Sequence, residues 1–276
     1  MFLAALANVR RGVVACVFDT SDRLQHMFYG QMGNPGSPHA TVIEEMYARM
    51  DALLGETLPF VDGRTALFVL SDHGFRSFRR SVHLNSWLQQ NGYLVLREPL
   101  PENGLSRAFF ADVDWTRTRA YALGLSGLYL NLRGREAHGI VPPGEEAAAL
   151  RHEIAAGLLA LRDVDGQAPA AHVYATAQLY RGPYLDAAPD LIVGYGDGYR
   201  VSWESAVGQA TGCVLQDNPK AWSGDHCVDP VLVPGVLFSN LRLAADDPGI
   251  EDLAPTVLDL FGVARPGWMD GHALRT

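Results

Sequence analysis

Three short segments of this sequence place carboxylates close to imidazoles. Asp22 and His26 are four residues apart, so on a helix both side chains share one face and can converge on one cation. Asp72 and His73 are adjacent and follow an apolar run directly, and His226 lies in a short polar loop. Carboxylate oxygens and imidazole nitrogens are ligands that divalent transition metals accept. The first two segments therefore predict metal ligands, whereas His226 taken alone is better explained as a loop histidine.

Each segment also has an interpretation without metal. Asp22 and His26 could make a helix-surface contact, with the acidic residue favoured by the helix dipole. Asp72 could cap a turn, although His73 would still need a partner when desolvated, and a loop residue such as His226 commonly bonds a backbone carbonyl. Position favours the ligand role for the first pair, because open α/β sheets bind ligands at the carboxyl ends of their strands.

The neighbours of these residues have more ordinary roles. We expect Asp225 either to orient the imidazole beside it or to cap a turn, and Cys227 to be a small buried thiol rather than a ligand. We assign Trp222 to packing, and we interpret Arg79 and Arg80 as a solvated surface pair.

The elements that must position these residues follow from apolar patterning. Runs that are apolar on both faces suit interior parallel strands, and apolar residues three and four apart suit helices. Strand and helix alternate, which predicts an α/β fold: a layered, mostly parallel sheet with helices on both faces. The expected strands cover residues 13–18, 66–70, 191–193 and 233–238, and the expected helices cover 41–54, 81–90, 145–161 and 250–261, the last ending at Gly262.

The domain organisation follows from length and composition. The 276 residues predict a single catalytic-type domain over 1–276, and the proline-rich stretch at about 92–189 interrupts the rhythm as an inserted or cap subdomain. A composition of 48% apolar and 19% charged residues excludes disorder. A net charge of −9 argues against a nucleic-acid partner, and the single lysine, Lys220, argues against polybasic membrane attachment.

Compartment is indicated by the cysteines and the N-terminus. Cys16, Cys213 and Cys227 are odd in number and unpaired in spacing, which favours a reducing compartment over a disulfide framework. No run of residues is long enough to cross a bilayer, and Arg10 and Arg11 follow the first apolar stretch instead of preceding it, unlike a secretory signal. The sequence predicts a cytoplasmic protein.

Together the segments resemble the type I phosphodiesterase and nucleotide pyrophosphatase branch of the alkaline phosphatase superfamily. The resemblance rests on three motifs, which occur in the order of that family: residues 18–28 (FDTSDRLQHMF), residues 71–75 (SDHGF) and residues 224–226 (GDH). It implies the alkaline-phosphatase-like fold and a hydrolase of phosphodiesters or phosphomonoesters, nucleotides among them, that uses two divalent metal ions.

The resemblance also implies a ligand set. One metal would be bound by Asp22, His26 and His226, and the second by Asp72 and His73. The expected ion is zinc, and manganese or iron is compatible with the same ligands. The expected partner is a small phosphate-ester substrate, whose negative charge two cations could accept even on an acidic chain.

This sequence departs from the family at its start. The family's domain begins with an earlier strand, whose Asp completes the second metal site, and with a Thr or Ser nucleophile. Twelve residues precede Val13, so we expect an N-terminally truncated chain in which Thr20, Ser21 and Ser71 serve as turn and cap residues and the nucleophile is absent. An exposed sheet edge, and with it self-association, would follow. An inactive metal-binding fragment, or a sulfatase or phosphoglycerate mutase of the same superfamily, remains an alternative.

Overall fold

The computed structural model describes residues 1–274, which form two compact units. The first unit combines Met1–Asp19, Glu44–Gly74 and the chain from Pro234 onward, and the second combines Thr20–Ile43 with Phe75–Val233. Each unit is therefore built from segments that are distant in the sequence.

The first unit is mainly helical, with one two-stranded sheet. Strands β1 (Phe68–Ser71) and β10 (Val236–Ser239) pair antiparallel, with Ser71 opposite Val236. Asn240 extends this pairing, because its side chain accepts a hydrogen bond from Leu67 N and donates one to Thr65 O. Its α-helices are α1 (Phe2–Asn8), α3 (Val42–Thr57) and α8 (Leu253–Leu260), and its 3-10 turns are η2 (Leu58–Phe60) and η5 (Ile250–Asp252). The first two residues of α3 are assigned to the second unit.

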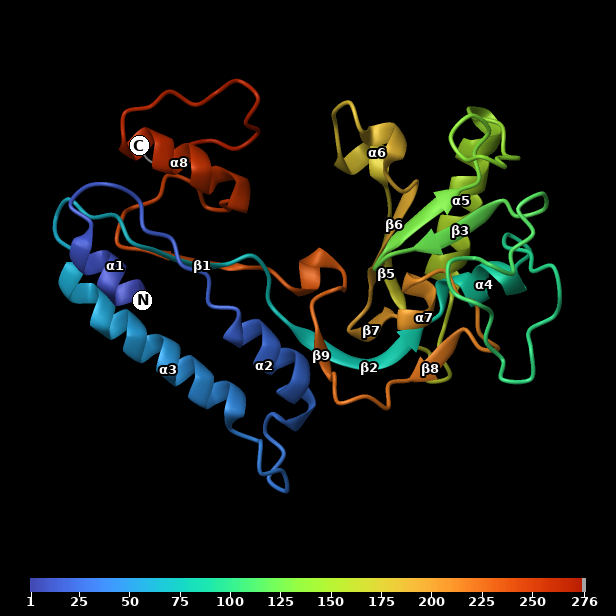
Figure 1. The fold of residues 1–276 in the computed structure, drawn as a ribbon, viewed down its shortest axis with the longest axis horizontal. Helices are drawn as coiled ribbons and strands as arrows, with labels where there is room; N and C mark the ends of the chain where they lie inside the picture. Colours follow the sequence, from blue (N-terminus) through green and yellow to red (C-terminus); the bar gives the residue numbers. More distant parts are fainter. Residues whose placement is uncertain (275–276) are drawn as a thin grey trace. The chain divides into compact units, whose positions relative to one another are not determined.

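The second unit contains the sheet that bears on the candidate site (Figure 1). Its central strand is β2 (Arg76–Val82), which pairs parallel with β7 (Gly198–Val201) and antiparallel with β8 (Leu215–Asp217). The amino end of β2 also pairs antiparallel with the short strand β9 (Gly224–Asp225). Helix α2 (Thr20–Phe28) packs against β9 and is followed by η1 (Tyr29–Gln31).

A second sheet supplies most of the core of this unit. Its strand order is β3 (Ala120–Leu123), β4 (Gly127–Leu130), β6 (Leu191–Tyr195) and β5 (Ala170–Ala175), all antiparallel. Helix α5 (Glu145–Ala160) packs on β5 and buries Ile154 and Leu158. Its Ala, Leu and Glu residues favour a helix, and two glutamates in the first turn suit the dipole. The remaining elements are α4 (Leu84–Gln90), α6 (Thr176–Leu179), α7 (Trp203–Ala206), η3 (Leu185–Ala187) and η4 (Pro230–Leu232).

The α/β class is confirmed, but the expectation of one mostly parallel sheet is wrong. Residues 1–274 form three sheets, and β2 with β7 is the one parallel pair of named strands. Tight connections explain the difference: β3 and β4 are joined by three residues, a length that permits antiparallel pairing only. Apolar runs buried on both faces cannot distinguish the two arrangements when each sheet is covered on both sides.

Several element boundaries also differ from the sequence expectation. Residues 13–18 are extended but form no strand, because no described strand pairs with them, and Val17 is 91% exposed. The expected helix at 81–90 starts only at Leu84, since Ser81 and Val82 complete β2. The helices expected at 41–54, 145–161 and 250–261 are confirmed within a few residues, and Gly262 ends α8 with a φ of 69°.

Residues 92–189 lie wholly in the second unit, where they supply β3, β4, α5 and β5. Because β6 lies between β4 and β5, this stretch shares a sheet with the chain that follows it. Its role as an inserted or cap subdomain stays a prediction. Within residues 1–274, none of the helices has the length and apolar character that a membrane span requires.

Candidate metal site

Helix α2 brings Asp22 and His26 onto one face, as their spacing predicts. Asp22 lies in the first turn of the helix and His26 in the last, one turn apart. The imidazole of His26 is buried, with 6% of its side chain exposed, whereas the Asp22 side chain is 38% exposed. The Nε2 atom of His26 lies 3.5 Å from Oδ1 of Asp22. The carboxylate therefore faces both the imidazole and solvent.

The loop that carries His226 is fixed to the same helix by backbone hydrogen bonds. Ser223 N donates to the carbonyl of His26 at 2.8 Å, and Gly30 N donates to Oγ of Ser223 at 2.9 Å. Gly224 is required where β9 meets α2, because a Cβ there would lie 2.5 Å from the Gln25 carbonyl oxygen. This close approach places His226 over the face of α2 that carries Asp22.

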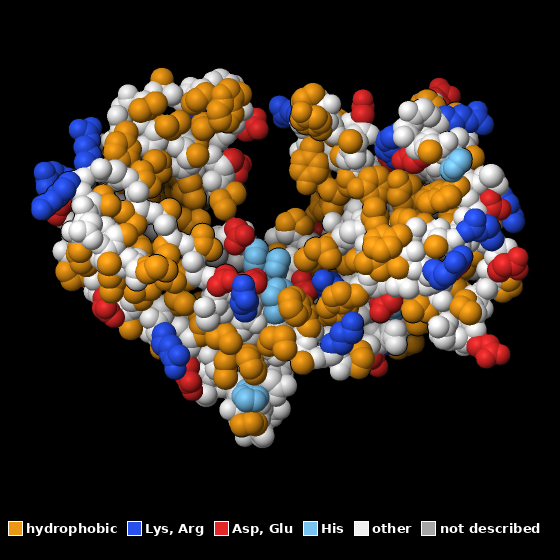
Figure 2. Space-filling view, in the orientation of Figure 1, with side chains coloured by type: hydrophobic (Ala, Val, Ile, Leu, Met, Phe, Trp, Pro, Cys, Tyr) orange, Lys and Arg blue, Asp and Glu red, His pale blue; other side chains and the backbone are white. Residues whose placement is uncertain are grey.

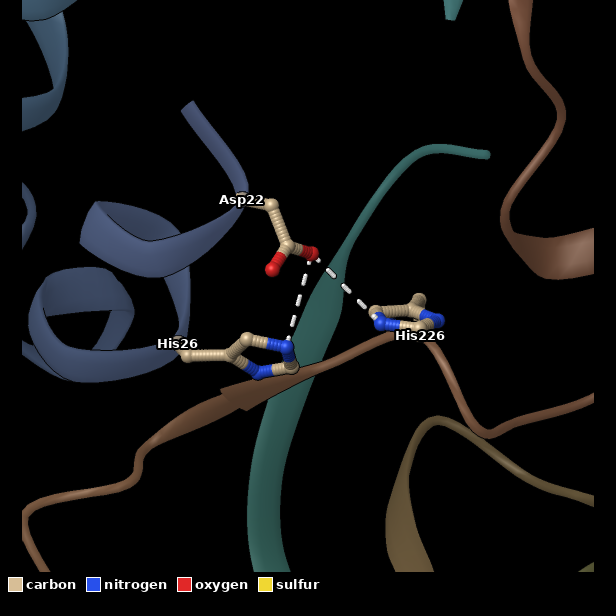
Figure 3. Close-up of side chains that lie close together, drawn as sticks. All are labelled: Asp22, His26 and His226. Atoms are coloured by element: carbon tan, nitrogen blue, oxygen red, sulfur yellow. Dashed lines mark ion pairs between the residues drawn. The ribbon is translucent and has the colours of Figure 1, made fainter. Parts of the chain in front are cut away.

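The three side chains meet around one carboxylate oxygen (Figure 3). The Nε2 atom of His226 lies 3.5 Å from Oδ1 of Asp22, the same distance and the same oxygen as for His26. All three ligand atoms fall within 4.8 Å of one another. Bond lengths of about 2.0–2.2 Å at a tetrahedral zinc put neighbouring ligand atoms about 3.3 Å apart, so the cluster has the spacing of a preformed cation site.

Hydrogen bonding fixes the tautomer of His26 in the form that a metal needs. Nδ1 of His26 lies 2.8 Å from the carbonyl oxygen of Gly224. A carbonyl can only accept, so Nδ1 donates this bond, and in the neutral tautomer the lone pair of Nε2 faces Asp22. An imidazole nitrogen and a carboxylate oxygen are donor types that a divalent transition metal accepts. The residues present therefore fit a cation.

Aromatic rings enclose the two imidazoles. Trp222 stacks on His26 with centroids 3.8 Å apart and ring planes 27° apart, and Phe75 meets both His26 and His226 edge-on, at 4.9 and 5.4 Å. On the face shown in Figure 2, pale-blue histidine side chains lie beside red acidic ones in the region of α2 and β9. Apolar walls of this kind lower the local dielectric and strengthen any ligand–cation interaction.

Asp225 is buried under the cluster and does not hydrogen-bond the imidazole of His226. Its Oδ2 pairs with Nε of Arg200 at 2.6 Å and accepts from Nε1 of Trp222 at 2.8 Å. Its Oδ1 accepts from the backbone N–H groups of His226 and Cys227, so it is a turn cap, one of the two expected roles. Burial opposes ionisation, but Arg200 and these hydrogen bonds outweigh it and lower the pKa of Asp225.

A second grouping of possible ligands, Asp225, His226 and Cys227, is less suited to a cation. Both oxygens of Asp225 are already engaged, by three hydrogen bonds and the ion pair with Arg200. Burial, with Asp225 close by, raises the pKa of Cys227 to about 12 and keeps the thiol protonated. Metals bind the thiolate, so the first cluster is the better site.

Asp72 and His73 belong to the first unit, whereas the other three expected ligands belong to the second. They follow β1 directly, as expected, and Nε2 of His73 lies 3.7 Å from Oδ1 of Asp72. Nδ1 of His73 lies 3.0 Å from the carbonyl of Gly74, the same tautomer that His26 adopts. The Asp72 side chain is 71% exposed. Their role as ligands stays a prediction.

Two residues of the site were not anticipated from the sequence. Arg200 lies 5% exposed between Asp225 and the rings of Phe78 and Trp203, and nothing in its sequence context indicates this. The packing role expected for Trp222 agrees with its stacking on His26, but the sequence analysis did not anticipate that its partner would be a residue of the cluster. Its position four residues before His226 was the available signal. Arg80 is also not a solvated residue, since it pairs with the buried Asp163 at 2.6 Å.

The fold and the cluster define an α/β protein with a His–His–carboxylate site, and comparison with known proteins identifies its family. The family model for type I phosphodiesterase / nucleotide pyrophosphatase matches residues 2–213. This range covers most of the chain and includes Asp22, His26, Asp72 and His73, while His226 lies beyond it. The chain belongs to this family.

The similarity to a solved structure is weaker. The crystal structure of a mutant of the alkaline phosphatase PafA is similar to this chain with a TM-score of 0.39 and 15% sequence identity. The match covers 92% of this chain and 45% of that chain, so the present chain spans about half the length of the protein it matches. No curated protein matches this chain in sequence.

Proposed function

We propose that Asp22, His26 and His226 bind one divalent cation in the active centre of a phosphoester hydrolase. The observation that carries this proposal is the shared oxygen: Oδ1 of Asp22 lies 3.5 Å from Nε2 of both imidazoles. Family membership supports a phosphoesterase. Imidazole and carboxylate ligands suit zinc, and also manganese or iron.

The residues of the chain have distinct parts in this site. His26 offers Nε2 because its Nδ1 proton is donated to Gly224, and the ring is held between Trp222 and Phe75. The more exposed Asp22 and His226 leave the site open toward solvent on one side. A bound cation would polarise a phosphoryl oxygen and stabilise the negative charge that develops on it.

We also propose that Asp72 and His73 contribute to a second cation site, as in the resembling family. The support is chemical: an adjacent carboxylate and imidazole, with Nδ1 of His73 bonded to a carbonyl and Nε2 facing Oδ1 of Asp72. The substrate class would be phosphodiesters or phosphomonoesters, nucleotides among them. Family membership supports this substrate class.

Metal analysis with matched variants tests the first site. We expect purified protein to bind zinc, and His26→Ala and His226→Ala each to lose the one zinc ion of this site. His172→Ala is the control, because His172 is also a histidine of the second unit paired with an aspartate, Asp229 at 2.8 Å, but lies outside the cluster. Zinc content that is equal in all four proteins would reject the assignment.

The stoichiometry of binding tests the second site separately. Two cations per chain in the parent and one in Asp72→Asn would support ligation by Asp72, and one cation in both would reject it. Hydrolysis of bis-p-nitrophenyl phosphate then tests catalysis. Strong activity that disappears with a chelator would support a complete centre in this chain, whereas cation binding without turnover would support the metal-binding fragment.

We also propose a binding partner, a cellular location and self-association for this chain. We propose a small phosphate ester as partner, with neither nucleic acid nor membrane, because the net charge of −9 opposes polyanionic surfaces. A cytoplasmic location is consistent with free Cys16, Cys213 and Cys227 in the described chain. Self-association through exposed apolar residues near β10, such as Phe238 at 65% exposure, would appear as concentration-dependent mass in light scattering.

A further inference from the structure

We propose that the buried Asp225 is a positioning residue that sets the geometry of both imidazoles of the cation site. This inference rests on the proposed function for its metal readout, but its structural claim can be tested without metal. Asp225 is 1% exposed, accepts a hydrogen bond from the indole of Trp222, which stacks on His26, and accepts another from the backbone N–H of His226.

The carboxylate of Asp225 accepts three hydrogen bonds and forms one ion pair. Oδ2 accepts from Nε1 of Trp222 at 2.8 Å and pairs with Nε of Arg200 at 2.6 Å, and Oδ1 accepts from the N–H groups of His226 and Cys227 at 2.9 and 2.8 Å. A carboxylate can accept at both oxygens, whereas an amide has one acceptor and one donor. Asparagine at this position would therefore direct an NH₂ group at a donor on one side or the other.

The first connection runs to His26 through Trp222. The indole stacks on the imidazole at 3.8 Å, and its Nε1–H bond to Asp225 fixes the rotation of the ring. The Trp222 carbonyl is also held, by the side chain of Asn218 at 2.7 Å. The stacked wall of His26 is therefore fixed in place from both ends, and one of these ends is Asp225.

The second connection runs to His226 through the backbone. Because Oδ1 accepts from the N–H groups of two successive residues, the peptide plane before His226 cannot rotate without breaking a charge-assisted bond. This orients the Cα–Cβ bond of His226 and hence the direction of its imidazole. One carboxylate thus controls two ligands that are 200 positions apart in the chain (26 and 226).

Arg200 makes this arrangement stable in a buried position. The residue is 5% exposed, and its guanidinium lies over Phe78 and Trp203 at 5.4 and 4.4 Å and donates to the Val201 carbonyl. Removing one member of such a pair leaves an uncompensated buried charge. A variant of Asp225 will therefore lose stability as well as geometry, and the experiment needs a control that separates the two effects.

The chain supplies a closely matched control in Asp163. Its side chain is also 1% exposed, pairs with an arginine Nε (Arg80) at 2.6 Å and accepts from an aromatic donor (the Tyr199 hydroxyl) at 2.8 Å. It also accepts from a backbone N–H, that of Val164. None of these partners belongs to the cation cluster. Asp163→Asn should cost a similar free energy of unfolding without touching either imidazole.

The decisive experiment compares Asp225→Asn, Asp163→Asn and the parent by calorimetric titration with Zn²⁺ and by urea unfolding. We expect Asp225→Asn to weaken zinc binding about 10–100-fold, the range for groups that orient metal ligands, while Asp163→Asn stays within about twofold of the parent at comparable loss of stability. Equal zinc affinity in Asp225→Asn and the parent, or equal weakening in both variants, would overturn the proposal.

A metal-free readout separates this proposal from the proposed function. Stacking on Trp222 shifts the ring protons of His26 upfield in NMR spectra, and we expect that shift to be lost in Asp225→Asn and kept in Asp163→Asn. If the parent binds no zinc, the proposed function fails and this comparison alone decides the positioning role, which an unchanged His26 shift in Asp225→Asn would overturn. If Asp225→Asn does not fold, Trp222→Phe replaces it: loss of the indole bond should weaken zinc binding about fivefold, and unchanged affinity would overturn the proposal.

Discussion

His26 and Gly224, 198 residues apart in the chain, are joined by a hydrogen bond of 2.8 Å from the imidazole Nδ1 to the backbone carbonyl. This bond orients the ring and leaves its Nε2 lone pair directed at Asp22. The same Gly224 has no room for a side chain against α2. One residue of β9 therefore fixes both the distance between loop and helix and the orientation of the buried His26 ring.

Removal of metal should destabilise the protein. A ligand present at about 100 times its Kd stabilises the native state by about 2.7 kcal/mol. For a protein of this length, that free energy corresponds to a rise in Tm of about 5–10 °C. We expect zinc-saturated protein to melt higher than chelator-treated protein by this amount in calorimetry. In Asp22→Asn, which lacks the charge shared by both imidazoles, the zinc-induced shift should be small. A full shift in that variant would show that the stabilising ion binds elsewhere.

Gly224→Ala should separate β9 from α2. The added methyl carbon would lie 2.5 Å from the Gln25 carbonyl oxygen and 2.6 Å from Cβ of Tyr29, so the loop must move. Overpacking of this kind costs about 1–3 kcal/mol, and we expect a lower urea midpoint together with weaker zinc binding. The matched control is Gly212→Ala, whose added carbon would meet nothing within 4 Å. If the two variants behave alike, the close approach of β9 and α2 is not a constraint.

Stability should fall as the pH is lowered through the range in which His83 titrates. Burial lowers the pKa of His83 below its usual 6.5, although Glu204 and Gln216 oppose the shift. The unfolded chain therefore binds a proton at a higher pH than the folded chain, so this contribution to stability is fully present above pH 6.5 and is lost as the pH falls toward the folded pKa. The free energy of unfolding from urea curves should decrease over that window in the parent.

His83→Gln keeps a polar side chain near Gln216, which lies 3.2 Å from Nε2 of His83, and removes the titrating group. Its stability should depend less steeply on pH than that of the parent below pH 6.5. The difference between the two curves isolates His83 from the other histidines, because those are present in both proteins. Parallel curves for parent and variant would contradict a lowered pKa.

The sequence was most informative where a local pattern has one physical outcome. The spacing of Asp22 and His26 placed them on one helical face, and the apolar periodicity of residues 145–161 located α5 almost to the residue. Convergence of His226 on that pair followed from resemblance alone, since no local rule joins positions 26 and 226.

What the sequence could not supply depends on long-range pairing. Apolar strands look alike whether they pair parallel or antiparallel, so the strands expected at 66–70, 191–193 and 233–238 were assigned to a parallel sheet, whereas β1, β6 and β10 all pair antiparallel. Arg200 lies in a strand and contacts Asp225 only because β2 brings β7 and β9 together. A residue whose role comes from two other strands carries no signal of that role in its own neighbours.

Cys227→Ser should leave zinc binding unchanged. The alternative grouping of Asp225, His226 and Cys227 would use the thiol as a ligand, but burial raises its pKa to about 12 and a protonated thiol is a poor ligand. We therefore expect calorimetric titration to give the parent's Zn²⁺ affinity within about twofold, and the exposed Cys213→Ser serves as a control for thiol binding unrelated to the site. A loss of affinity in Cys227→Ser alone would move the cation from Asp22 to the loop, and His26→Ala should then have no effect.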